Sequence, residues 1–268
     1  MSIYKKLVDD INELRRRNKK NFITNSFFNM QQLKSMLDME SINVKKSEDV
    51  IIILNEEEQL IRLYFYATSL ESLIQIRNIL PGNFNKPVVA EIIGKGTQIE
   101  NVLTELRKVN FKQHNKLIRM NRVGQEYSEK NISNVSIAIE NQVSEIMDIL
   151  YGEFDIYTSH LPTKEKLLTS IKNQEIAVVI EQDKIVGLAY FESLGERLNY
   201  LYQIVVDQKF RGQGIADSLL IYKFKHSPKD VACQLWVEIN NQYAIDKYHK
   251  YNFVEDGLVD YIMIFEGV

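Results

Sequence analysis

The segment that most constrains the fold of this chain runs from Tyr202 to Ala216, where an apolar strand leads through two glycines directly into a helix. The backbone N–H groups at the start of a helix have no partner inside the helix, and the positive end of the helix dipole lies there. Glycine lets the main chain approach a ligand closely, because it carries no Cβ atom. A strand, a glycine turn and a helix in this order therefore predict a phosphate- or pyrophosphate-binding turn.

Two common phosphate-binding motifs fit this turn poorly. A Walker A loop ends in Gly-Lys followed by Ser or Thr, whereas Gly214 is followed by Ile215 and Ala216. A dinucleotide-binding fingerprint requires a third glycine where this chain has Asp217. The turn is therefore assigned to neither class, and Arg211 adds a charge that can pair with phosphate oxygens.

Hydrophobic periodicity predicts alternating strands and helices around the turn, between residues 134 and 268. Gln182-Asp183-Lys184 separates two β-branched segments and is typical of a hairpin. The expected strands are 135–139, 175–181, 185–192, 200–206, 231–239 and 259–265, and the expected helices are 143–154, 163–171, one beginning at Ile215, and 242–251.

Two motifs in this half resemble those of the GNAT superfamily of acyl-CoA-dependent N-acyltransferases. Residues 211–216, Arg-Gly-Gln-Gly-Ile-Ala, are similar to its (Gln/Arg)-x-x-Gly-x-(Gly/Ala) motif. Residues 241–253 are similar to its Asn-x-x-Ala-x-x-x-Tyr-x-x-x-Gly-Phe motif, except that Asn252 replaces the usual glycine. Asparagine is the next best residue at a left-handed helix end. The resemblance covers residues 134–268 and implies the GNAT fold, an α/β fold with a mixed, mostly antiparallel central sheet flanked by helices.

The resemblance also implies a site for acetyl-CoA. The amides of residues 212–216 would hold the pyrophosphate, and the main chain of Ile204 and Val206 would pair with the pantetheine arm like an added strand. Asn241 would bond that arm or cap the following helix, and both roles can hold. The implied cofactor-binding residues are Ile204, Val205, Val206, Arg211, Gly212, Gln213, Gly214, Ile215, Ala216 and Asn241. The implied reaction moves an acetyl or other acyl group to a primary amine of a small molecule or peptide.

Acyl transfer to an amine needs a general base and a general acid. The resemblance gives the acid role, protonation of the leaving sulfur, to Tyr248, whose alternative role is an aromatic packed under the last strand. The strand before the turn lacks the glutamate that many GNAT enzymes use as a base, and Tyr202 or Gln203 there could only relay a proton through water. Glu238 and Glu192, both at strand ends, are the candidate carboxylates, with a solvated charge as the alternative for each.

The first half is predicted to be a diverged, GNAT-like copy of the second, in tandem with it. Lys108-Val109-Asn110-Phe111 and Lys250-Tyr251-Asn252-Phe253 follow a predicted helix at the matching position, and a methionine, Met120 or Met263, follows each in a strand. A chance match is the alternative. Residues 124–134 have linker composition, so we expect domains at 1–125 and 134–268. The first copy lacks the glycine turn, and we expect it to cover one edge of the second domain or to help form the acceptor site.

The distribution of charge along the chain bears on the acceptor and on a nucleic-acid partner. Residues 1–130 carry 21 basic and 16 acidic side chains, and residues 131–268 carry 12 and 20, so the halves have net charges of +5 and -8. The negative second half favours a cationic acceptor, or is a solvated surface of no functional consequence. Arg15, Arg16 and Arg17 are expected at the end of a first helix rather than on nucleic acid.

The single cysteine, Cys233, excludes a disulfide framework and a cysteine-rich metal site, and it is expected in the core. His160, Tyr151, Phe154 and Tyr157 fall where the superfamily binds its acceptor, or are surface and packing residues. A charged N-terminus and the lack of long apolar segments predict a cytoplasmic protein without a membrane partner. The acceptor and the oligomeric state stay open.

Two competing functions remain. An acyl-CoA sensor would bind the cofactor without turnover, and it would release no thiol. An aminoacyl-tRNA-dependent transferase with a tandem GNAT-like fold would lack the pyrophosphate motif, so residues 211–216 argue against it.

Overall fold

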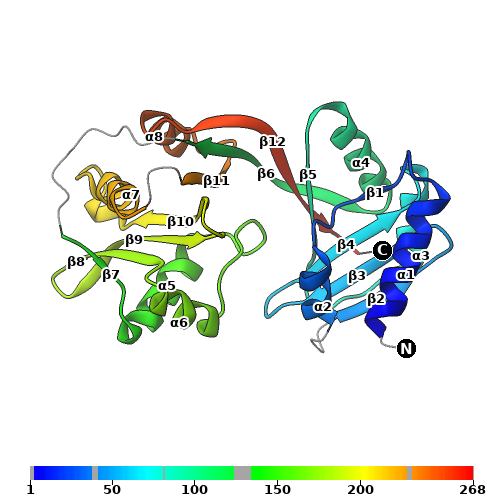
Figure 1. Cartoon of the computed structure of the whole chain (residues 1–268), viewed down its shortest axis with the longest axis horizontal. Coiled ribbons are helices and arrows are strands. Elements are labelled where there is room, and N and C mark those ends of the chain that lie inside the picture. The colour runs from blue at the N-terminus through cyan, green and yellow to red at the C-terminus, as the bar shows by residue number, and fades with distance from the viewer. Residues whose placement is uncertain (1–2, 38–41, 81, 124–133, 228–230, 268) are drawn as a thin grey trace. The chain divides into compact units, whose positions relative to one another are not determined.

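A computed structural model of the chain describes residues 3–37, 42–80, 82–123, 134–227 and 231–267 (Figure 1). They form two compact units: unit 1 is Met1–Lys116 with Leu258–Val268, and unit 2 is Leu117–Gly257. Strands β6 (Phe111–Arg122) and β12 (Val254–Phe265) each run from one unit into the other, so the units differ from the expected domains at 1–125 and 134–268. All of the expected linker except Asn134 lies outside the described residues.

Unit 1 is built on a sheet whose strand order is β2-β3-β4-β5-β12, with the short β1 also paired to β4. All neighbours are antiparallel except β4 and β5. Its elements are α1 (Ile3–Arg17), β1 (Ile23–Thr24), α2 (Met30–Leu37), β2 (Ile42–Lys46), β3 (Val50–Glu56), β4 (Ile61–Ala67), the 3₁₀ helix η1 (Glu71–Gln75), α3 (Ile76–Ile79), β5 (Val88–Gly94) and α4 (Gly96–Lys108).

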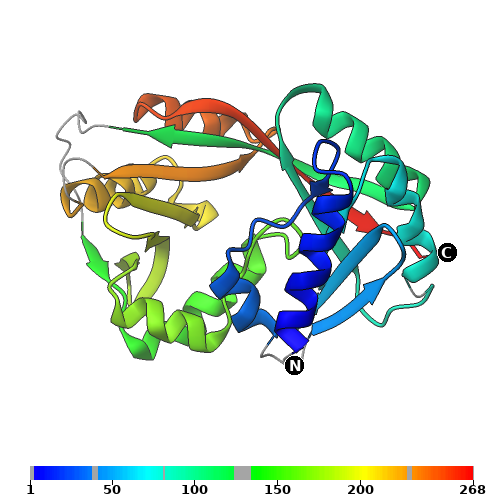
Figure 2. The same cartoon turned by 45° about the vertical axis from the view of Figure 1, so that its right-hand side comes forward.

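Side chains of this sheet alternate between two cores, as a strand period of two requires. Ile51 and Ile53 pack with α1 and α2, whereas Ile52 packs with η1, α3 and α4 on the other face. Figure 2 shows α1, in dark blue, lying across the strands. The three arginines 15–17 form the last turn of α1, as predicted.

Unit 2 has the strand order β6-β11-β10-β9-β8-β7, in which only β10 and β11 are parallel. Helices α5 and α6 pack on one face of this sheet, and α7 and α8 pack on the other (Figure 1). Its elements are β7 (Val135–Ile137), the 3₁₀ helix η2 (Glu140–Gln142), α5 (Val143–Glu153), α6 (Lys164–Lys172), β8 (Ile176–Glu181), β9 (Lys184–Ser193), β10 (Leu198–Val206), the 3₁₀ helix η3 (Gln208–Phe210), α7 (Ile215–Lys225), β11 (Ala232–Glu238) and α8 (Gln242–Lys250).

These elements confirm the predicted α/β fold class and most predicted bounds. Gln182 and Asp183 both have positive φ, 50° and 59°, which is the conformation of a two-residue hairpin turn. The last strand begins earlier than predicted, at Val254 instead of residue 259. Its start is polar and has no apolar alternation, but Asp256 accepts hydrogen bonds from Arg119 Nε at 2.7 Å and Asn121 Nδ2 at 2.8 Å. No helix among the described residues is long and apolar enough to cross a membrane.

The internal repeat is visible at the ends of α4 and α8. Asn110 and Asn252 follow these helices with φ of 65° and 61°, and the next residues, Phe111 and Phe253, are both buried. In each copy a run of antiparallel strands, β2-β3-β4 in the first and β7-β8-β9-β10 in the second, leads to a parallel strand, a helix and a final strand. The final strands are exchanged, because β6 of the first copy pairs with β11 and β12 of the second copy pairs with β5.

Candidate functional site

Strands β10 and β11 diverge in the middle of unit 2. They are paired in parallel from Leu198 with Ala232 to Leu201 with Leu235, and β10 then continues to Val206. A β-bulge between Leu201 and Gln203 interrupts the register of β10 with β9 at the same point. Bulges bend a strand and redirect its side chains. The edge of β10 that leaves β11 can therefore accept an extended ligand as an added strand.

The turn after β10 has the conformation that its two glycines predict. Gly212 and Gly214 both have φ of 81°, and a Cβ atom on either would meet nothing within 4 Å. These glycines are therefore required by backbone conformation and not by crowding within the protein. Helix α7 begins at Ile215, and the Ser218 amide is the donor to Gly214 O. The amides just before Ser218 therefore have no partner inside the helix and can bind a ligand at the positive end of the helix dipole.

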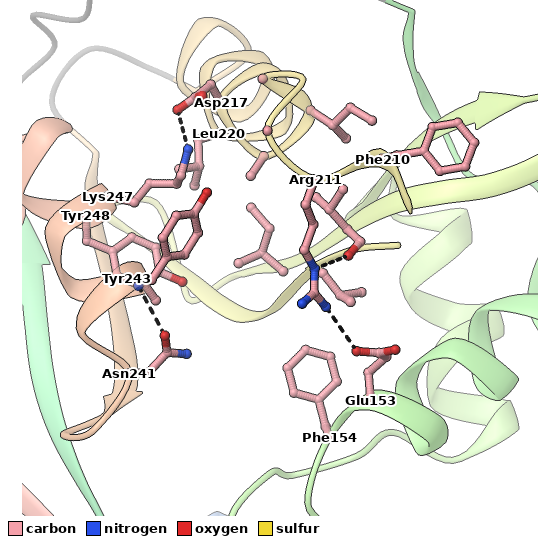
Figure 3. Close-up of a pocket in the computed structure, with 18 residues that line it drawn as sticks. Glu153, Phe154, Phe210, Arg211, Asp217, Leu220, Asn241, Tyr243, Lys247 and Tyr248 are labelled. Atoms are coloured by element: carbon pink, nitrogen blue, oxygen red, sulfur yellow. Dashed lines mark hydrogen bonds and ion pairs between the residues drawn. The ribbon is translucent and has the colours of Figure 1, made fainter. Parts of the chain in front are cut away.

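A pocket of about 370 Å³ lies between this turn, the end of β10 and α8 (Figure 3). The pocket is lined by Glu153, Phe154, Ile204, Val205, Val206, Phe210, Arg211, Gly212, Gly214, Ile215, Ala216, Asp217, Leu220, Asn241, Tyr243, Ala244, Lys247 and Tyr248. It brings together every predicted cofactor-binding residue except Gln213, and it includes Tyr248. Gln213 and Glu238 do not line this pocket.

Helix α8 holds Tyr248 through capped ends. Asn241 Oδ1 accepts a hydrogen bond from the Ala244 amide at 3.1 Å, so Asn241 caps the helix start. At the other end the Phe253 amide donates to Tyr248 O at 3.1 Å, and the Asn252 amide donates to His249 O at 3.0 Å. This is a Schellman motif, and the Tyr248 and Phe253 rings make its apolar contact with centroids 5.5 Å apart. Burial raises the pKa of Tyr248, so its phenol stays protonated.

Comparison with known proteins adds an independent observation. Residues 143–253 match the profile of the acetyltransferase (GNAT) family. This segment is a GNAT domain. Its family supports an acyltransferase role for the chain. No curated protein sequence matches the chain.

Solved structures share the fold over both units. A GCN5-related N-acetyltransferase from Sphaerobacter thermophilus is similar with a TM-score of 0.57 and 12% identity, over 90% of this chain and 88% of that one. A tandem GNAT protein from the clavulanic acid biosynthesis pathway has a TM-score of 0.52 and 10% identity, over 84% and 83%. A GNAT-family acetyltransferase from Colwellia psychrerythraea has a TM-score of 0.52 and 17% identity, over 83% and 82%. These likenesses show the tandem GNAT fold.

Some pocket residues of the GNAT domain were missed by the sequence motifs. Arg211 Nε donates to Val206 O at 3.0 Å, and its guanidinium pairs with Glu153 of α5 at 3.5 Å. Figure 3 shows this pair on one side of the pocket and α8 on the other. Asp217 of α7 accepts from Lys247 Nζ at 2.9 Å and from Tyr251 Oη at 2.8 Å, which joins the two helices beside the pocket. Lys247 precedes Tyr248 in the second motif and could have been found there, whereas nothing local marks Glu153.

The candidate bases occupy different surroundings. Glu238 is exposed at the last residue of β11. Glu192 lies on β9 and pairs with Lys166 of α6, with Oε1 and Nζ 2.7 Å apart. Gln203 is buried, and its Oε1 atom has no hydrogen-bond partner among the described residues.

The other sequence candidates have distinct positions. Phe154 lines the pocket, whereas Tyr151 packs partly buried against the α5 and α6 core. Tyr157 is partly buried and His160 is exposed. Cys233 is buried, and burial raises the pKa of its thiol to about 12. Its thiol is therefore protonated at neutral pH, which agrees with a core role.

The corresponding place in unit 1 is taken by the chain itself. Strands β4 and β5 pair only at Ile61 with Val88 and Arg62 with Val89, so they also diverge. Here β1 pairs with β4, and Asn25 Nδ2 donates to Leu63 O at 2.9 Å and Glu91 O at 3.1 Å. The Asn25 side chain thus bridges the two strands where unit 2 has its pocket.

Proposed function

We propose that this chain transfers an acetyl or other acyl group from acetyl-CoA to a primary amine of a small molecule or peptide. The observation that carries the proposal is the single pocket that joins the diverging edge of β10, the glycine turn and Tyr248. The turn would hold the pyrophosphate through the amides of residues 212–216 and the guanidinium of Arg211. The main chain of residues 204–206 would pair with the pantetheine arm.

The residues of the pocket suit this chemistry. Bound acetyl-CoA would supply a thioester, whose carbonyl carbon is the electrophile. A backbone N–H on residues 204–206 can polarise the carbonyl oxygen. Tyr248, whose pKa is raised by burial, is protonated and can give its proton to the leaving sulfur. Asn241 is used as the helix cap, and its amide nitrogen remains a donor for the pantetheine arm.

Calorimetric titration with acetyl-CoA and desulfo-CoA tests the cofactor site. Gly214→Glu would place a side chain and a negative charge in the turn, and Gly195→Glu is the matched control. Gly195 also has positive φ, 69°, and open space around its Cβ position, but it lies in the turn between β9 and β10. We expect micromolar binding by the wild type and Gly195→Glu, and none by Gly214→Glu. No binding by the folded wild type would overturn the proposal.

A sensor that binds acyl-CoA without turnover is the second candidate, favoured by the exposed position of Glu238 away from the pocket lining. Thiol release with tyramine, spermidine and ethanolamine separates the two functions. A thiol reagent can report the released CoA, because the only cysteine of the chain is buried. Binding together with no thiol release from any amine would favour the sensor.

A further inference from the structure

The edge of β10 that β11 leaves carries main-chain groups, and the register of the sheet shows which residues supply them. Neighbouring residues of a strand direct their N–H and C=O groups to opposite edges. The Asp207 amide donates to Val186 O of β9 at 2.9 Å, so this amide points to β9. The N–H and C=O groups of Val206 and Ile204 therefore point away from β9, to the edge that β11 leaves. These are the groups to which we assign the pantetheine arm.

One of these groups is engaged by Arg211. The Nε atom of Arg211 donates to Val206 O at 3.0 Å, and its Nη2 atom lies 3.5 Å from Glu153 Oε2 at the end of α5. Figure 3 shows the guanidinium between these two partners. Val206, Arg211 and Glu153 all line the pocket. The contact therefore lies inside the proposed cofactor site and uses an acceptor that an added strand would need.

The turn between β10 and α7 brings Arg211 back over the end of the strand. The Asp207 carboxylate caps η3 by accepting a hydrogen bond from the Lys209 amide at 2.8 Å. Arg211 follows η3 and precedes Gly212, whose positive φ directs the chain toward α7. The arginine is thus placed between the strand edge and the first amides of α7. Its side chain can bond either the Val206 carbonyl or an anion that those amides hold.

We propose that Arg211 selects the acyl donor by its diphosphate, because the arginine closes the edge of β10 until an anion at the turn draws it away. This inference rests on the proposed function and names the donor class that the site accepts. Glu153 holds the guanidinium over the strand edge. A diphosphate at residues 212–216 gives the guanidinium a stronger partner and frees Val206 O for an N–H of the pantetheine arm. A thioester on pantetheine alone brings no such anion and meets a closed edge.

The strengths of the contacts allow this exchange. The side chains of Arg211 and Glu153 are 55% and 48% exposed, and an exposed ion pair contributes little because water screens it. A guanidinium bonds two phosphate oxygens at once, and such charged hydrogen bonds are about twice as strong as neutral ones. The turn amides hold the same anion, since they have no partner inside α7. A diphosphate therefore displaces the contacts of Arg211, whereas a neutral arm does not.

Two ligands separate this role from simple phosphate binding. Desulfo-CoA carries the diphosphate, whereas pantetheine carries neither the phosphates nor the nucleoside. We expect Arg211→Ala to weaken desulfo-CoA binding by about 10-fold or more, because it removes a charged hydrogen bond. The same variant should tighten pantetheine binding by about 2- to 5-fold, because it frees Val206 O. Glu153→Gln should tighten the binding of both ligands, because it releases the arginine and removes a negative charge from the pocket.

Calorimetry measures the affinity for desulfo-CoA, and NMR titration measures the weaker affinity for pantetheine. Lys209→Ala is the matched control, because Lys209 is an exposed cation of η3 that does not line the pocket. It should leave pantetheine affinity unchanged, and all variants should unfold at the wild-type temperature. Pantetheine affinity that is unchanged or weaker in Arg211→Ala would overturn the selection and leave the cofactor site intact. No desulfo-CoA binding by the folded wild type would overturn both proposals.

Discussion

Gly187 sets how closely helix α7 approaches the sheet of unit 2. It lies in β9 between Val179 of β8 and Val206 of β10. A Cβ atom there would lie 2.5 Å from Ile215 Cγ2 and 3.4 Å from Leu219 Cδ1. Carbon atoms in contact are about 3.5–4.0 Å apart, so Gly187→Ala forces a shift of about 1 Å at Ile215. Because Ile215 is the first residue of α7, this shift reaches the turn to which we assign the pyrophosphate.

The cost follows from two opposing effects. Overpacking a core costs about 1–3 kcal/mol, whereas replacing glycine by alanine inside a strand gains about 0.5–1 kcal/mol. We therefore expect Gly187→Ala to lower the free energy of unfolding by about 1–2 kcal/mol and to weaken desulfo-CoA binding. In an Ile215→Ala background the clash is gone, and Gly187→Ala should stabilise by about 0.5–1 kcal/mol.

Urea unfolding of the four proteins, with calorimetric titration of each, completes this double-mutant cycle. The single variant Ile215→Ala is itself expected to cost about 2–5 kcal/mol, because it removes a buried side chain. The sign change of the Gly187→Ala effect between the two backgrounds is the decisive result. The same effect in both backgrounds would refute the assigned contact.

Five further outcomes are expected. Asn252→Val should lower the free energy of unfolding by about 1–2 kcal/mol in thermal melts, since φ is 61°, and Asn252→Gly should not. Asp217→Ala should cost about 1–3 kcal/mol in urea, because it unpairs Lys247 and Tyr251; a neutral result would contradict a structural role for the link between the helices. Tyr248→Phe should lower kcat by about 100-fold without changing desulfo-CoA affinity, and an unchanged kcat would exclude it as the acid. Burial raises the pKa of Tyr248 in the folded state, so the contribution of Tyr248 to stability is present below the unfolded-state pKa of about 10 and is lost as the pH rises above it. The free energy of unfolding of Tyr248→Phe should therefore fall less between pH 9 and pH 11 than that of the wild type. The difference should be up to about 1.4 kcal/mol per pH unit. Cys233 should react with a thiol reagent only on unfolding, and labelling of the native protein would show that its strand opens.

The candidate site shows where sequence reasoning succeeds. Gly212 and Gly214 predicted the turn because positive φ is a local property of the backbone. Asn241 and Asn252 predicted the ends of α8 for the same reason, since capping involves residues within a single turn. Helical spacing placed Tyr248 on the same face of α8 as Asn241 and Ala244, and the resemblance to the GNAT motif implied that this face meets the cofactor.

Partners distant in the chain could not be predicted. The pairing of Arg211 with Glu153 joins residues from a turn and from the end of another helix, and no spacing rule relates them. The bulge of β10 between Leu201 and Gln203, which no sequence pattern marked, lets Leu201 and Ile204 pack in the same core. The sequence favoured Glu238 as the catalytic carboxylate and left Glu192 as a further candidate, but only the structure shows that Glu238 is exposed and that Glu192 pairs with Lys166.

The sequence by itself determined the order of strands and helices, the conformation of the turns and the existence of two similar halves, because periodicity, glycine and asparagine act over a few neighbouring residues. The tertiary structure alone decided that β6 pairs with β11 and β12 with β5. It also decided that Asn25 bridges the strands of unit 1 where unit 2 keeps its pocket. Strand pairing joins segments far apart in the chain, and many strands carry equivalent apolar patterns. Their partners are therefore chosen by the packing of the whole molecule.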